Sequence, residues 1–226
     1  MKTWMKWATA AAVVVVLGVV GGPFVYINFI KDDPPEEATL DTVAGTVAGD
    51  PVGADGEWTI DPSPSFVGYR VVEVLFGQDT EGVGRTSEIT GGLTVAGTQV
   101  TAADFEVDMA SVTSDEERRD NQFRGRIMDT ANFPTATFVL TAPIELGSVP
   151  ADGVPVTTSA TGDLTLKGTT NPVTFDVEAQ KNGATIQVVG STDIVFADYG
   201  IEDPSTSGIS TQDHGLLEFD LRFVPA

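Results

Sequence analysis

The feature that most constrains the fold is a two-residue alternation of apolar and polar side chains, which recurs through the chain after Trp58. Three clear examples are DFEVDM at 104–109, VTFDVEA at 173–179 and LEFDLRF at 217–223. Successive side chains of a β-strand point to opposite faces, so each segment is predicted to form a strand with one apolar and one charged face.

Turn signals divide these segments at short intervals. Asn182-Gly183, between two alternating runs, is a strong signal for a β-hairpin. The pattern predicts about eight strands interrupted by one helix, which favours an antiparallel barrel or sandwich over a βαβ sheet. A closed barrel of about eight strands can be filled by side chains or can hold one small ligand. Periodicity does not distinguish a filled core from a ligand cavity.

The alternation breaks between Ser111 and Phe138, where a short helix is predicted over about 114–128. Thr113 and Ser114 are suitable N-cap residues, and a glutamate follows three positions after each in the pattern of a capping box. Pro134 disfavours helix in the residue before it and so ends the segment. Four-residue spacing places three side chains on one helix face: Arg119, Phe123 and Ile127.

This helix also carries four arginines, at positions 118, 119, 124 and 126, although the whole chain has only 12 lysines and arginines. Two interpretations remain open. The arginines can pair with neighbouring glutamates on a solvated helix face. Alternatively, the positive patch receives an anionic head group near the mouth of whatever the strands enclose.

Residues 1–30 are predicted to be an N-terminal membrane anchor. The apolar run from Ala8 to Ile30 would span about 35 Å as a helix, which is enough to cross a bilayer. Lys2 and Lys6 should stay in the cytoplasm, which makes the protein single-pass in the cell membrane with its C-terminal domain extracytoplasmic. The competing interpretation is a cleaved signal peptide, but its apolar region is normally shorter.

An acidic linker rich in Pro, Gly and Ala is predicted over 31–56, followed by one folded domain over 57–226. As a flexible coil, the linker would hold that domain within roughly 30 Å of the membrane. The net charge of −21 repels phosphate backbones, so nucleic acid is excluded as a partner. The chain has no cysteine and therefore no disulfide or thiolate site. Its sequence is compatible with a homodimer but does not set the oligomeric state.

Four stretches resemble the YceI-like family of lipid-binding proteins over about residues 57–225. They read WTIDP at 58–62, RD at 119–120 with NFPTATF at 132–138, GDLTLKGTTNPV at 162–173, and DYGI at 198–201. The resemblance implies a lipocalin-like barrel of eight antiparallel strands with a helix near one end. It also implies an elongated apolar cavity associated with polyisoprenoids, such as isoprenoid quinones or prenyl pyrophosphates.

The sequence departs from that family pattern at two positions. Pro64-Ser65 stands where many members have a His-Ser pair, and Phe196 lies near the place of an arginine that many members carry. If those polar residues hold a head group in other members, that contact is missing here.

We predict that the apolar faces of the strands and helix line an isoprenoid-binding tunnel, with ordinary core packing as the alternative for any single residue. Arg119 is the candidate for contact with a pyrophosphate or quinone oxygen, and an internal salt bridge to Asp120 or to a strand carboxylate is the alternative. The predicted ligand-binding residues are Tyr69, Phe105, Val107, Arg119, Phe123, Ile127, Phe138, Leu164, Leu166, Phe175, Ile194, Phe196, Leu217, Phe219 and Leu221.

Beyond a bound lipid, the sequence predicts no cofactor, no metal and no enzymatic activity. His214 is the only histidine, so a Ser-His-Asp hydrolase would have to be built on it. The main alternative function belongs to another class, a membrane-anchored β-domain that binds protein partners through its surface and has a filled core. An apolar tunnel through the barrel would favour lipid binding, whereas a fully packed barrel would favour the interaction domain.

Overall fold

A computed structural model describes Gly22, Val25 and residues 34–41, 53–75, 77–148, 150–206 and 208–226. The predicted membrane anchor over 1–30 lies outside these residues apart from Gly22 and Val25, and it stays a prediction. Within the described part of the chain, no helix is both long enough and apolar enough to cross a bilayer.

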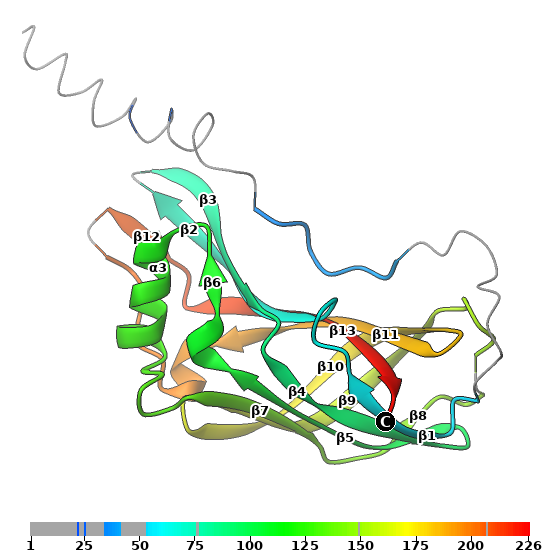
Figure 1. The fold of residues 1–226 in the computed structure, drawn as a ribbon. Coiled ribbons are helices and arrows are strands. Elements are labelled where there is room, and N and C mark those ends of the chain that lie inside the picture. Colours follow the sequence, from blue (N-terminus) through cyan, green and yellow to red (C-terminus); the bar gives the residue numbers. More distant parts are fainter. Residues whose placement is uncertain are drawn as a thin grey trace, which may run out of the picture.

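The strands form an antiparallel barrel, as the alternation and turn signals predicted (Figure 1). Each strand pairs with the next in the spatial order β1-β4-β5-β7-β9-β10-β11-β13, and pairing of β1 with β13 closes the ring. The prediction of eight antiparallel strands is therefore confirmed. Their bounds are β1 (Gly56–Ile60), β4 (Ile89–Ala96), β5 (Gln99–Asp108), β7 (Thr135–Leu140), β9 (Val156–Leu166), β10 (Thr169–Asn182), β11 (Thr185–Val195) and β13 (His214–Pro225).

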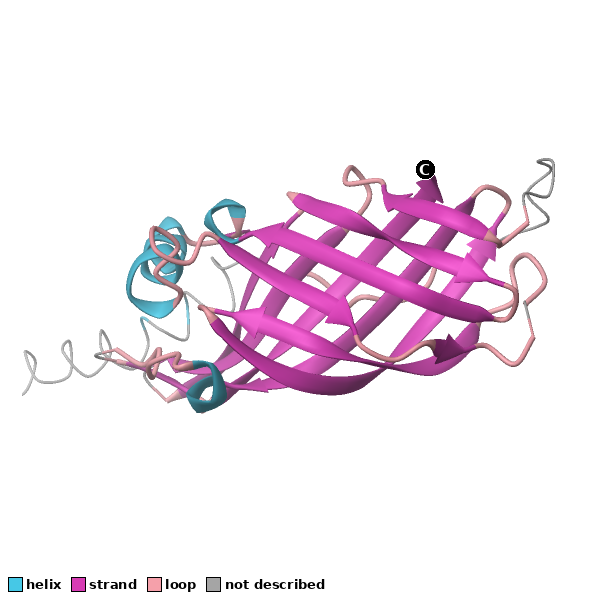
Figure 2. Ribbon diagram, turned by 90° about the horizontal axis from the view of Figure 1, so that it is seen from below, coloured by secondary structure: helices cyan, strands magenta, loops and turns pink. Residues whose placement is uncertain are grey.

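A further hairpin extends one end of the barrel. It consists of β2 (Phe66–Leu75) and β3 (Gln78–Thr86), and β2 pairs with β13 next to the place where β1 does. Two short strands, β6 (Thr113–Ser114) and β12 (Ile209–Thr211), pair with β3 and β2 respectively, and β8 (Ile144–Glu145) pairs with β5. The helical segments gather at the hairpin end, which we call the mouth end (Figure 2).

The predicted short helix is present, but its beginning was placed too early. It comprises α3 (Glu117–Gln122) and an adjoining π-helical turn, η3 (Phe123–Ile127). The capping-box prediction was wrong because Ser114 belongs to β6, and the N-cap is Glu116, which makes no side-chain capping bond. Instead the Ser114 backbone N–H and hydroxyl donate to the Asp120 carboxylate at 2.8 and 2.6 Å, which ties the helix to the strand before it.

Two 3-10 turns also flank the mouth end, η2 (Met109–Ser111) after β5 and η4 (Phe196–Tyr199) after β11. Phe196, one of the predicted lining residues, does not belong to β11. It instead begins η4, where its backbone N–H donates to the Asp213 carbonyl at 3.0 Å.

Part of the predicted flexible linker is docked on the barrel. Residues 34–41, which we call the strap, run along the outside of β13 and its neighbours (Figure 1). The expectation of a free coil was wrong for this stretch, because strap backbone groups bond to Arg70, Arg85 and Gln187 on the barrel. The two bonds from arginines are charge-assisted and therefore stronger than those between neutral groups.

Candidate ligand-binding tunnel

A predominantly apolar cavity of about 480 Å³ lies inside the barrel. At the mouth end the cavity is lined by Leu75 and Ile209. At the opposite end of the barrel it is lined by Ile144 of β8 and by Leu146 just after it. Ligand pockets of small molecules and cofactors commonly measure about 300–1,000 Å³. The barrel is therefore not filled by its own side chains.

Every residue predicted to bind the ligand lines this cavity. The alternation placed the strand residues correctly because the barrel interior receives one face of every strand. Ligand contact by these residues stays a prediction. Those on strands or η4 are Tyr69, Phe105, Val107, Phe138, Leu164, Leu166, Phe175, Ile194, Phe196, Leu217, Phe219 and Leu221, and those on the helix are Arg119, Phe123 and Ile127.

Aromatic rings form a connected row on the tunnel wall. The ring centroid of Phe138 lies 6.2 Å from that of Phe105 and 5.5 Å from that of Phe175. The ring centroids of Phe175 and Phe219 lie 5.8 Å apart. Glycine makes room for two of these rings, since a Cβ on Gly190 would come within 2.6 Å of the Phe219 ring. A Cβ on Gly162 would come within 2.4 Å of Phe138. The rings can therefore lie close to the wall and leave the lumen open.

Small inward residues widen the lumen further, and they were missed as site residues. Ala103, Ala136, Ala160 and Ala179 all line the cavity from different strands. Each falls on the apolar parity of its strand, so a sequence signal existed: alanine at a position where a filled barrel needs a bulky side chain.

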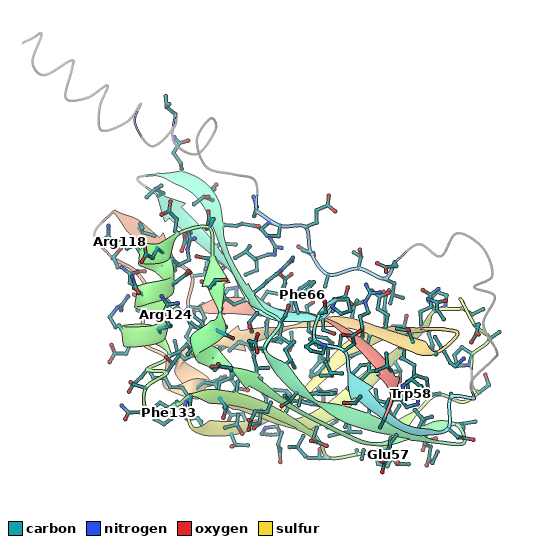
Figure 3. The ribbon with its side chains drawn as sticks, in the orientation of Figure 1. Glu57, Trp58, Phe66, Arg118, Arg124 and Phe133 are labelled. Carbon is teal, nitrogen blue, oxygen red and sulfur yellow. The ribbon has the colours of Figure 1, made fainter. Side chains whose placement is uncertain are left out.

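The mouth of the tunnel is lined by the helix, the β2–β3 hairpin and the segment before β12. Arg118 and Gln122 of α3, Leu75 of β2, and Pro204 and Ile209 on the opposite side all line it. Figure 3 shows Arg118 and Arg124 on the helix at this end, and Trp58 towards the other end of the barrel. The mouth therefore combines apolar edges with charged side chains of both signs, since Glu73 and Glu116 line it beside Arg118 and Arg119.

Arg119 lines the mouth but is already paired. Its guanidinium forms ion pairs with Glu73 of β2, at 3.2 Å, and with Asp115. Burial alone would lower the pKa of Arg119, but the neighbouring carboxylates raise it, so the side chain stays charged. Of the two interpretations of Arg119, the structure shows the salt bridge to a strand carboxylate. The partner named beside it, Asp120, bonds to Ser114 instead.

Arg118 is exposed at this mouth, and no ion pair holds it within the described part of the chain. Arg124 bonds to Asn121 at 2.9 Å, and Arg126 donates to the Asp203 and Pro204 carbonyls. The ion pairs of this patch are those of Arg119, with Asp115 just before the helix and with Glu73 of β2. Arg118 is therefore a second candidate, beside Arg119, to meet an anionic group at the entrance.

Tyr69 supplies a neutral polar group just inside the mouth. Its ring stacks on Phe123 with centroids 5.1 Å apart, which links β2 to the helix. Burial raises the pKa of Tyr69 above its ordinary value, so the phenol stays protonated at all physiological pH values. A protonated phenol can donate to a carbonyl or phosphate oxygen of a ligand.

Two other positions singled out from the sequence lie away from the tunnel lining. Ser65 is 1% exposed, and its hydroxyl donates to the Asp61 carbonyl at 2.6 Å and accepts from the Arg222 N–H at 2.8 Å. It therefore fixes the β1–β2 turn against β13. His214 is partly exposed beside Asp213, at 2.8 Å. No group of three or more potential metal ligands occurs among the residues that the structure describes.

Comparison with known proteins agrees with this geometry. The YceI-like domain family matches residues 58–223. The chain therefore belongs to the YceI-like family. This YceI-like chain is 32% identical over 153 residues to a UPF0312 protein of Shewanella denitrificans, covering 64% of the chain and 71% of the relative. It is 28% identical over 171 residues to a UPF0312 protein of Pseudomonas savastanoi, covering 73% and 78%.

Two solved structures share the fold of this YceI-like protein. One is a polyisoprenoid binding domain from Saccharophagus degradans implicated in plant cell wall breakdown, with a TM-score of 0.63 and 20% identity. It covers 75% of this chain and 98% of that chain. The other is Burkholderia cenocepacia BcnA, with a TM-score of 0.57 and 26% identity, covering 72% and 98%.

Proposed function

We propose that this protein binds an isoprenoid-type lipid, either a quinone or a prenyl phosphate, with the tail in the tunnel and the head group at the mouth. The observation that carries the proposal is the open apolar cavity of about 480 Å³ inside the barrel. Its shape suits a long chain, because it joins the mouth to the opposite end of the strands. The solved domain from Saccharophagus degradans, described as polyisoprenoid binding, supports the same ligand class.

The energetics favour exchange of lipid with a membrane. Each buried CH₂ gains about 0.8 kcal/mol relative to water, so a 20-carbon tail would gain roughly 16 kcal/mol. That gross value approaches the limit of measured non-covalent affinities. Relative to a bilayer the gain nearly vanishes, because the tail is already in an apolar medium. We therefore infer that the protein carries or stores lipid beside the membrane in which residues 1–30 anchor it, on the extracytoplasmic side.

The alternative function is a membrane-anchored β-domain that binds protein partners, and it was predicted to have a filled core. The cavity argues against that version, because the apolar faces of the strands and helix surround open space.

Ala160→Phe tests the proposal by filling the lumen. Ala160 is 4% exposed, lines the tunnel and faces Phe175 across the β9–β10 pair, so a second ring there occupies the path of the tail. The matched control is Thr157→Phe, which adds the same ring to an exposed position of the same strand. Uptake of tritiated geranylgeranyl phosphate from vesicles should fall more than about tenfold in Ala160→Phe and be unchanged in the control. Equal uptake by both folded variants would exclude the tunnel as the binding site.

A further inference from the structure

The strap follows a row of charged and polar side chains on the outside of the barrel. Arg70 Nη2 donates to the Pro35 carbonyl at 2.7 Å, and Arg85 donates to the Glu36 carbonyl. Both arginines also pair with Glu218, which is 1% exposed in β13. The first half of the strap is therefore held by cations that are themselves fixed in the barrel wall.

The second half of the strap is held by a separate set of groups. Gln187 Nε2 donates to the Thr39 carbonyl at 3.2 Å, and the Asp41 N–H donates to Gln187 Oε1 at 3.0 Å. Asp41 also pairs with Arg222 at 2.7 Å. Most of the strap contacts use its backbone, so they fix the position and direction of the segment.

The direction of the strap distinguishes the two ends of the barrel. Arg70 faces its first residues and lies closer to the tip of the β2–β3 hairpin, whereas Arg222 faces its last residue and lies close to the C-terminus of β13. The strap therefore begins nearer the mouth end and ends nearer the opposite end of the barrel, and the blue segment in Figure 1 runs in this direction. Pro34 is the residue to which the preceding chain is attached, and it is at the end of the strap nearer the opening of the tunnel.

The opening itself is lined by apolar side chains and by charges of both signs. Leu75 and Ile209 lie there with Arg118 and Arg119 and with Glu73 and Glu116. The four arginines of the mouth helix are matched by four carboxylates between Asp115 and Asp120, so the helix has no net positive charge. The direction of the strap, not charge, therefore determines which end of the barrel lies next to the preceding chain.

We propose that the mouth end is a contact surface for a lipid bilayer and that the strap holds the barrel with its mouth facing that bilayer. The inference rests on the membrane anchoring of residues 1–30 that is part of the proposed function. It adds the orientation of the barrel and the residues that set it. A docked strap replaces a freely tumbling tether with a fixed one, so the tunnel stays within reach of membrane lipid.

The absence of cysteine allows a direct test of this orientation on the full chain. A bimane label is placed at Asp79→Cys, on the exposed tip of the β2–β3 hairpin, or at Ala184→Cys, in the exposed β10–β11 turn at the other end. Each labelled chain is reconstituted in phosphatidylcholine–phosphatidylglycerol vesicles that contain head-group spin-labelled lipid. We expect quenching of the Asp79→Cys label to exceed that of the Ala184→Cys label severalfold.

Replacement of residues 34–41 by a Gly/Ser segment of equal length should abolish this difference, because the barrel then reorients freely. Replacement of residues 43–50 in the same way is the matched control and should preserve it. Equal quenching of the two labels in the unaltered chain, a difference that survives strap replacement, or failure of the full chain to enter the vesicles would each overturn the inference. Extraction of bound isoprenoid from the same samples reports on the tunnel separately, and its absence would leave the quenching result intact.

Discussion

The two faces of β13 differ in how they become buried. Its inward residues, such as Phe219 and Leu221, face the tunnel because the barrel closes around them. Its outward residues Glu218 and Asp220 are also buried, at 1% and 7% exposure, yet they lie under the strap. Glu218 pairs with arginines of β2 and β3, and Asp220 pairs with Arg222 of its own strand. One strand thus bears an apolar surface that leaves room for a ligand and a charged surface that is covered by its own chain.

This contrast shows which kind of burial a local pattern can predict. The alternation assigns each residue of β13 to a face, and closure of the barrel then buries the apolar face wherever such a barrel forms. Burial of the polar face depends on residues 34–41, which are far from β13 in the sequence. The alternation of side chains cannot predict that contact.

Removal of the buried outer charge should have the largest effect on stability. Glu218→Ala leaves Arg70 and Arg85 without their buried carboxylate partner. Breaking a buried pair in this way costs about 3 kcal/mol, so urea denaturation should show a loss of that order in the free energy of unfolding. The control is Glu178→Ala, at an exposed outward position of β10, which should change stability by less than about 0.5 kcal/mol. Similar values for both variants would contradict the assignment of the outer row as a buried network.

Shortening the tunnel should change which isoprenoid chain lengths bind more than it changes the stability of the protein. Ala179 lines the tunnel near the end of β10 that is distant from the mouth, so Ala179→Phe shortens the space for the tail. Binding of an octaprenyl chain should weaken more than about tenfold, while a farnesyl chain that stops short of this position binds as before. Competition between tritiated short and long chains measures the ratio. An unchanged ratio in the folded variant would place the tail elsewhere.

The two mouth arginines should differ in their effects on an anionic ligand. Arg119→Ala removes the charge nearest Tyr69 and is expected to weaken binding of a prenyl phosphate severalfold without unfolding the barrel. Arg118→Ala should have a smaller effect that disappears at high salt, because exposed charges are screened. A neutral quinone serves as the control ligand and should bind both variants normally. Unchanged prenyl phosphate affinity in folded Arg119→Ala would remove Arg119 from the head-group site.

Acid should release the last part of the strap, and this is the smallest effect. The hydrogen bond from Arg222 lowers the pKa of Asp41 below its ordinary value of 3.8, despite the opposing effect of burial. The ion pair therefore contributes fully above that ordinary value and is lost as the pH falls through the lower pKa of the docked carboxyl. A nitroxide at Glu37→Cys should become more mobile in this acidic range, and Asp41→Asn should show that mobility already at neutral pH. Identical spectra for the two chains would contradict the role of Asp41.

The sequence predicted the tunnel wall well and the mouth only in part. Leu217 and Phe219 could be placed because their position depends on strand parity alone, and Arg119, Phe123 and Ile127 because helical spacing put them on one face. The beginning of the helix was missed since Ser114 pairs with Gly84 of β3, a distant contact that overrides its preference for capping. The strap contacts likewise join residues that are far apart in the sequence. No local pattern indicates which arginine of the helix has an ion-pair partner.

The central claim is that the inner surface holds one isoprenoid chain, and native mass spectrometry of the full chain released gently from its membrane tests it most directly. Organic extraction of the same sample identifies whatever is bound. The account predicts one isoprenoid per chain in the wild type and none in Ala160→Phe. An unliganded mass for the wild type, with no uptake after incubation with quinones or prenyl phosphates, would contradict it.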